Sequence, residues 1–171
     1  VTTVNGNLEI NGTEGTDTLT LTEIDGDITI NSGNGINTIH LINTAVQSGN
    51  VTIDTGTGDD EISLTEIVGA LVLRAGSGGN KVTLRNTLVV GAQRFTGGSV
   101  NVTSGTGTDH VTMTNIGDDT RIELGDGDNQ LLLNNVSGDA LIKAGHGDNQ
   151  LLLNNVGGDA LITAGDGADR I

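Results

Sequence analysis

A repeat of about twenty residues limits what this chain can fold into. The segment 125–136, GDGDNQLLLNNV, returns almost unchanged at 145–156 as GHGDNQLLLNNV, and it begins once more at Gly165. A fixed period of this length is typical of repeat architectures, in which each unit packs only on its neighbours. Looser copies run back toward the N-terminus, with turns that begin at Gly12, Gly33, Gly56, Gly76 and Gly105.

Each copy contains two short segments in which apolar and polar residues alternate. Around the turn at Gly56, for example, Val51 and Ile53 come before the turn, and Ile62 and Leu64 follow it. This alternation indicates half-buried strands, and no window keeps a helical period. One copy cannot bury its apolar side alone, so stacked copies must share an interior. The sequence therefore predicts an all-β fold, a parallel β-solenoid of about eight coils that spans residues 1–171 as a single repeat array.

Two insertions, near 43–47 and 86–98, interrupt the period. Insertions in solenoids map to loops on the outside, so we expect two outward loops and no domain boundary. At the corners, glycine is expected where the backbone needs a positive φ angle. The Asp and Asn residues beside these glycines also favour turns, because they hydrogen bond to their own backbone.

Composition excludes several classes of partner. The formal net charge is -15, from 22 acidic and 7 basic residues, and this argues against nucleic-acid binding. No apolar run approaches the length that spans a bilayer, so membrane insertion is not expected. The chain has no cysteine, so it has no disulfide framework.

The strings NGNLEINGTEGTDTLTLTEI and SGNVTIDTGTGDDEISLTEI resemble the repeats of secreted bacterial β-strand-repeat proteins, notably the very large planctomycete-type surface proteins and adhesins. The resemblance covers all 171 residues. It implies an extracellular or cell-surface location and a solenoid fold.

A second set of strings, GTGDDEI, GTGTDHV and GDGADRI, is similar to part of the nonapeptide GGxGxDxUx of RTX calcium-binding repeats. That resemblance implies a secreted module in which calcium drives folding. The chain departs from the RTX pattern in its longer period, and in having the motif at only one corner of each coil. The motif's Asp is retained in some copies and is Asn in others: Asp17, Asp60, Asp109 and Asp169 against Asn37, Asn80, Asn129 and Asn149.

Calcium prefers about six to eight oxygen ligands, several of them anionic. Asp128 and Asp148 would lie about 4.8 Å apart in adjacent coils, where like charges repel unless a cation or solvent screens them. We therefore consider a calcium site at this corner, and as the alternative that these side chains face water and shape the turns. The candidate ligands are Asp126, Asp128, Asp148, Asp166 and Asp169.

Another column of the repeat carries asparagine, whose stacked side-chain amides can form a hydrogen-bonded ladder from coil to coil. We interpret this ladder as structural. Its members are Asn43, Asn86, Asn115, Asn135 and Asn155.

Catalysis is not expected. His40, His110 and His146 fall in different columns and different coils, so they form no common site, and the roles of an active site cannot be assigned. A carbohydrate-active β-helix enzyme and an ice-binding solenoid are distant alternatives. The second needs an outward array of threonine, and here His40 and Leu132 break the column of Thr20, Thr83 and Thr112.

Some leucines are predicted to face outward. Leu132 and Leu152 do so on one face, and Leu141 and Leu161 on the other, which predicts a surface for lateral partners. At the ends, Ile171 stops in the middle of a strand that the position of Val1 resumes one residue further on. Open strand edges pair with other chains, and a non-closing contact of that type gives filaments. We therefore expect an extracellular structural or adhesive rod that assembles with itself head to tail, or continues a longer array.

Overall fold

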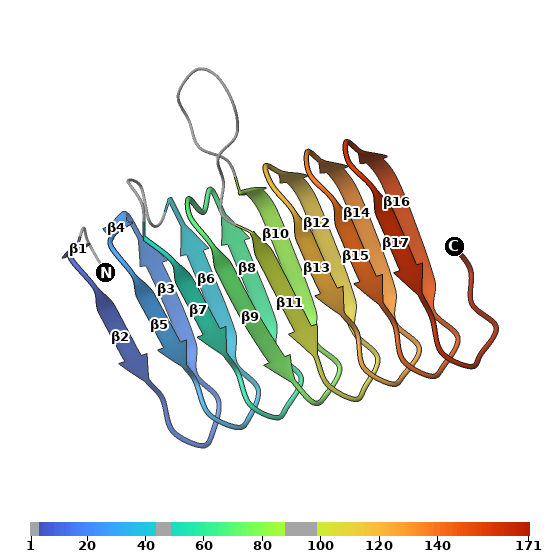
Figure 1. The fold of residues 1–171 in the computed structure, drawn as a ribbon. Helices are drawn as coiled ribbons and strands as arrows, with labels where there is room; N and C mark the ends of the chain where they lie inside the picture. Colours follow the sequence, from blue (N-terminus) through green and yellow to red (C-terminus); the bar gives the residue numbers. More distant parts are fainter. Residues whose placement is uncertain (1–3, 44–48, 88–98) are drawn as a thin grey trace.

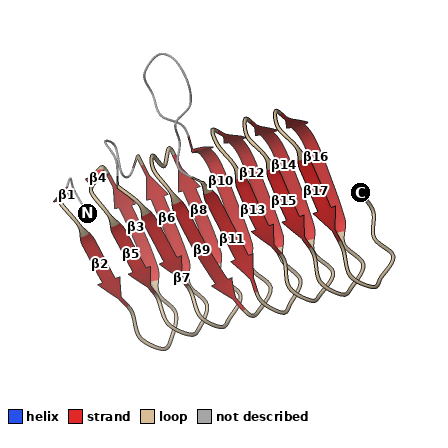
Figure 2. Cartoon of the chain, viewed as in Figure 1, coloured by secondary structure: helices blue, strands red, loops and turns tan. Residues whose placement is uncertain are grey.

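The computed structural model describes residues 4–43, 49–87 and 99–171, and every regular element in these ranges is a β-strand (Figures 1 and 2). The chain winds so that its strands fall alternately into two main sheets, each made of parallel strands, and the two sheets face each other. This confirms the all-β parallel solenoid. The sequence period left open how many faces a coil has, and the structure shows two principal sheets.

One sheet has eight strands, in the order β17-β15-β13-β11-β9-β7-β5-β2. The other has seven strands, in the order β16-β14-β12-β10-β8-β6-β3, and a small two-stranded sheet joins β1 to β4. The strands are β1 (Val4–Asn5), β2 (Leu8–Asn11), β3 (Thr18–Thr22), β4 (Ile24–Asp25), β5 (Ile28–Asn31), β6 (Thr38–Ile42), β7 (Val51–Asp54), β8 (Glu61–Thr65), β9 (Leu71–Gly76), β10 (Lys81–Thr87), β11 (Val100–Ser104), β12 (His110–Ile116), β13 (Thr120–Glu123), β14 (Gln130–Val136), β15 (Ala140–Lys143), β16 (Gln150–Val156) and β17 (Ala160–Thr163).

Equivalent residues of successive copies lie directly side by side. Leu132 of β14 pairs with Leu152 of β16, and Leu133 pairs with Leu153. The array makes about seven turns of about 20 residues, close to the eight coils expected from the sequence. The difference arises at the C-terminal end, where the last copy reaches the seven-stranded sheet only through a bridge between Gln150 and Arg170.

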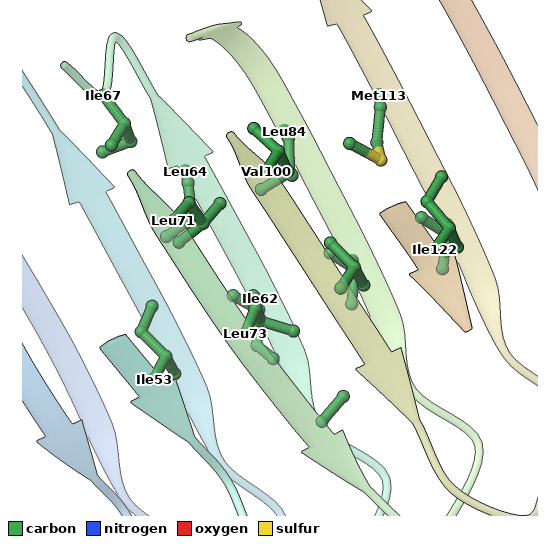
Figure 3. Close-up of a cluster of buried hydrophobic side chains, with 14 of the residues drawn as sticks. Ile53, Ile62, Leu64, Ile67, Leu71, Leu73, Leu84, Val100, Met113 and Ile122 are labelled. Carbon is green, nitrogen blue, oxygen red and sulfur yellow. The ribbon is translucent and has the colours of Figure 1, made fainter. Parts of the chain in front are cut away.

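The core lies between the two sheets and consists of the inward residues of the alternating pattern. Ile62 and Leu64 of β8 and Leu71 and Leu73 of β9 are all 0% exposed, and Figure 3 shows Leu64 beside Leu71 and Ile62 beside Leu73. A further inward residue closes the side of the coil at or just after the end of several strands of the seven-stranded sheet, as Ile67 does after β8 and Ile116 does at the end of β12. Alternation therefore identified the buried face correctly.

The insertions are only partly described. Asn43 follows β6, and Asn86 and Thr87 lie within the bounds of β10. The outward loops expected from the sequence otherwise lie outside the described residues.

Candidate functional site

Each coil passes from the eight-stranded to the seven-stranded sheet through a turn that we call the glycine corner. Buried Asp and Asn side chains gather at this turn. Its second glycine has a positive φ angle, 137° at Gly107. A Cβ atom placed there would lie 2.1 Å from the carbonyl oxygen of Gly78 in the coil before it. Successive corners thus stack so closely that no side chain fits between them, and only glycine is compatible with this position.

Behind the glycines runs a column of Asp and Asn side chains that points into the molecule, which we call the interior column. Away from its two ends its members are buried, with 0 or 1% of their surface exposed. In each coil the backbone N–H at this position donates to the side-chain Oδ1 of the equivalent residue in the next coil, as Asp109 does to Asn129 at 3.0 Å. The members are Asp17, Asn37, Asp60, Asn80, Asp109, Asn129, Asn149 and Asp169.

The asparagines of the interior column also satisfy the carbonyl groups of the corner. The Nδ2 of Asn129 donates to the carbonyl oxygens of Gly125 at 2.9 Å and Gly127 at 3.0 Å, and it lies 3.1 Å from Oδ1 of Asn149 in the next coil. Buried backbone groups that lack a partner destabilise a fold, so these bonds let the chain turn a tight corner inside the molecule.

The two fully buried aspartates of the column differ from the asparagines. In Asp60 and Asp109 the Oδ1 atom accepts the N–H from the preceding coil, at 2.8 Å and 2.9 Å, whereas the Oδ2 atom is buried without a hydrogen-bond partner. Burial raises the pKa of both carboxyl groups, because removal from water disfavours the charged form.

The candidate calcium ligands do not form one cluster. Asp126, Asp128, Asp148 and Asp166 are exposed at the outer side of the corner, whereas Asp169 is half-buried and belongs to the interior column. We call the four exposed residues the carboxylate corner. Among the residues that the structure describes, no three acidic or histidine side chains come together closely enough to hold a metal ion. Calcium binding stays a prediction.

The carboxylate corner instead makes contacts between coils. The Oδ1 atoms of Asp126, Asp128 and Asp148 accept backbone N–H groups of the following coil, each at 2.8 Å. The His146 Nδ1 accepts the N–H of Asp166 at 3.2 Å. These side chains therefore connect successive turns through hydrogen bonds.

The asparagine ladder predicted from the sequence is present at Asn115, Asn135 and Asn155. The Nδ2 of Asn135 donates to Oδ1 of Asn115, and that of Asn155 donates to Oδ1 of Asn135, both at 3.0 Å. All three residues have φ angles between 56° and 57°, the left-handed region that asparagine tolerates better than most residues. The ladder thus marks a second corner in the three coils that contain these residues.

The leucines expected to face outward do so. Leu132 is 39% exposed, Leu152 and Leu161 are each 62% exposed, and Leu141 is half-buried. Leu132 and Leu152 lie on β14 and β16, and the other pair lies on β15 and β17 of the opposite sheet. They form two separate apolar surfaces, which we call the leucine faces.

Of the two terminal residues predicted to meet head to tail, the structure describes only Ile171. Ile171 is 70% exposed and lies beyond the last strand, and Val1 lies outside the described residues.

Sequence reasoning recorded the alternation of Asp and Asn in the interior column but not its burial. The signal was available, because the fourth residue after the first turn glycine is Asp or Asn in every copy from Gly33 onward, directly before an alternating apolar strand. A short polar residue that recurs at such a place points to a backbone partner.

Comparison with known proteins returned no matching family model, no matching curated protein and no matching solved structure. Within the described residues, no helix is long and apolar enough to cross a membrane.

Proposed function

We propose that this chain is a structural element, an extracellular rod whose coils are built to receive further coils of the same kind. The observation that carries the proposal is the incomplete burial of the last coil. Ala140, Ile142 and Ala144 are 2%, 0% and 3% exposed, because β17 and its turn cover them. Their equivalents one coil later, from Ala160 to Ala164, are exposed or half-buried. A further coil would bury them in the same way.

Hydrogen bonds at the other corner, where each coil returns from the seven-stranded to the eight-stranded sheet, set the orientation of an added coil. Asp119 accepts the N–H of Asp139, and Asp139 accepts that of Asp159, at 2.9 Å and 2.8 Å. Asp159 holds the same place in the last coil, so its carboxylate is positioned to accept the N–H of a following coil. A coil added to this end must therefore arrive in the same orientation and register as those before it, which favours head-to-tail stacking.

The next coil can come from the same polypeptide or from another copy of this chain, and the surface that it meets is the same. The extracellular location is proposed from the sequence resemblance, and the net charge of -15 is compatible with it. The leucine faces add a means of lateral association between rods, since exposed apolar patches mark interaction surfaces.

Assembly of the purified 171-residue chain tests the proposal. We expect sedimentation velocity and electron microscopy to show rods that lengthen with protein concentration. Ile162→Lys places a charge on the inward side of the last strand and should stop growth. Thr163→Lys, on the outward side of the same strand, should leave growth unchanged. A monomer at all concentrations for all three proteins would contradict self-assembly.

A further inference from the structure

We propose that Asp60 and Asp109 are held in the folded rod as neutral carboxylic acids, which take the place of the asparagine amide and donate their proton to glycine carbonyls of their own turn. The folded protein would then carry two titratable groups in its interior column that make its stability depend on pH.

The asparagines show what this place in the corner requires. The Nδ2 of Asn80 donates to the carbonyl oxygens of Gly76 and Gly78, both at 3.2 Å. The same pair of bonds, to the glycines four and two residues earlier, recurs at the other asparagines of the column. These are Asn37, Asn129 and Asn149. The corner thus offers two carbonyl oxygens and needs a donor between them.

At Asp109 the glycines in the equivalent places are Gly105 and Gly107, and at Asp60 they are Gly56 and Gly58. An ionised carboxylate offers only acceptors, so a charged Oδ2 would face acceptors of its own kind. A protonated carboxyl has one O–H donor and keeps its second oxygen as an acceptor. The observed division fits this form, since Oδ1 accepts an N–H and the buried Oδ2 accepts no hydrogen bond.

The two oxygens of Asp109 are used differently by the preceding coil. Asn80 donates both its backbone N–H, at 2.9 Å, and its Nδ2, at 3.0 Å, to the Oδ1 of Asp109. The Oδ1 of Asp109 therefore accepts two hydrogen bonds, while the Oδ2 of Asp109 is buried without a partner. This asymmetry places the proton on Oδ2, where an asparagine would carry its NH₂ group.

The surroundings of the two acids shift the balance toward the neutral form. For Asp60, burial is the largest influence and raises the pKa, the neighbouring Thr55 and Asn37 lower it, and the charge of Asp59 raises it. For Asp109, burial again leads, and its neighbours Asn80, Ser104 and His110 lower the pKa without cancelling the effect. Asp59 and His110 are the charged or titratable groups that act on the pair.

The arrangement of the column agrees with isolated neutral acids. Asp60 lies between Asn37 and Asn80, and Asp109 lies between Asn80 and Asn129. Each acid therefore has an amide above and below it, and no second carboxyl group of the column faces it.

This arrangement couples folding to proton uptake. The ordinary pKa of an Asp in the unfolded chain is about 3.9, and the folded value is raised, so the folded state binds more protons between the two values. The stabilisation is fully present below the unfolded pKa and is lost as pH rises through the folded pKa. These two acids should thus stabilise the folded chain more below their folded pKa than above it.

The experiment is a titration of the intact chain by NMR, with ¹³C at the Asp Cγ atoms, together with melting curves across the same pH range. We expect Asp60 and Asp109 to titrate above the ordinary pKa of an aspartate. The double variant Asp60→Asn/Asp109→Asn should lose the part of the melting-temperature decrease with pH that these acids cause, and it should melt higher than the wild type at alkaline pH. Asp128→Asn/Asp139→Asn is the matched control, since it removes two carboxylates outside the interior column that also accept an N–H between coils, and it should keep the pH dependence.

Two results would overturn the proposal. One is titration of Asp60 and Asp109 at or below the ordinary pKa of an aspartate. The other is a shift of their Cγ signals on addition of calcium at neutral pH, which would show that a cation rather than a proton occupies the corner. Neither result would bear on rod assembly, which is measured separately.

Discussion

Asp109 and Asn129 lie one above the other in adjacent coils, and the backbone N–H of Asp109 donates to Oδ1 of Asn129 at 3.0 Å. Asn129 meanwhile donates to two glycine carbonyls of its own turn. One buried amide therefore joins two coils and closes one corner, so the stability of the rod should depend on both the amide and the glycines that it contacts.

Asn129→Ala should destabilise the protein by about 2 kcal/mol or more, because it removes the partner of the buried Asp109 N–H and that of the Gly127 carbonyl, at about 1–3 kcal/mol for a buried unsatisfied group. Chemical denaturation followed by circular dichroism measures the change. The control is Gln130→Ala, since Gln130 is the next residue and its side chain is exposed. Equal midpoints for the two variants would show that the interior column contributes little.

Gly107→Ala should also destabilise, by about 2 kcal/mol or more, because the φ angle of 137° is unfavourable for alanine and the new Cβ would overlap the Gly78 carbonyl. Gly79→Ala is the matched control. A Cβ at Gly79 would find its nearest neighbour, the Thr108 carbonyl oxygen, at 3.4 Å, and Gly79 has no positive φ angle. Thermal melting of the two variants compares these effects, and a Gly79→Ala melt as low as that of Gly107→Ala would contradict them.

Leu133→Asp and Leu132→Asp should behave oppositely. Leu133 is 0% exposed, so the first variant buries a charge without a partner and should unfold the surrounding coils. Leu132 is 39% exposed, so the second should keep the circular dichroism spectrum of the wild type while weakening lateral association of rods. If both variants unfold, or both remain folded, β14 does not have this inward and outward register.

The calcium hypothesis predicts a higher melting temperature in millimolar calcium than in chelator, by mass action on the folded state. Asp128→Asn/Asp148→Asn should remove that difference, because both residues belong to the carboxylate corner. Magnesium chloride at the same concentration controls for general screening of the negative charge. Identical curves in calcium, magnesium and chelator would remove the RTX-like interpretation.

The sequence predicted the strands well because a two-residue period has only one consistent inward face. It separated Leu133 from Leu132 for that reason, and the structure confirms both positions. It did not predict that Asn129 is buried, since asparagine is polar and is buried only where backbone groups need it. The carbonyl groups that accept hydrogen bonds from Asn129 come together only when the corner has formed. Their need for a hydrogen-bond donor therefore cannot be inferred from the asparagine alone.

The number of sheets could not be predicted from the sequence either. A period of about twenty residues fixes how much chain each coil contains, but not how the chain divides it between faces. The asparagine ladder could be predicted only in part. The sequence predicts a column that contains Asn115 and Asn135, but their left-handed backbone is seen only in the structure.

The near-identity of the coils that contain β14 and β16 has a consequence for inheritance. Leu131 pairs with Leu151, and Asn134 pairs with Asn154. Each of these two coils therefore presents the same residues to its neighbour. A gene for such an array can lose or duplicate one whole repeat, and the new junction brings together the same residues as the old one. The length of such an array can then change in steps of one coil, while the contacts at the junction between these two coils stay the same.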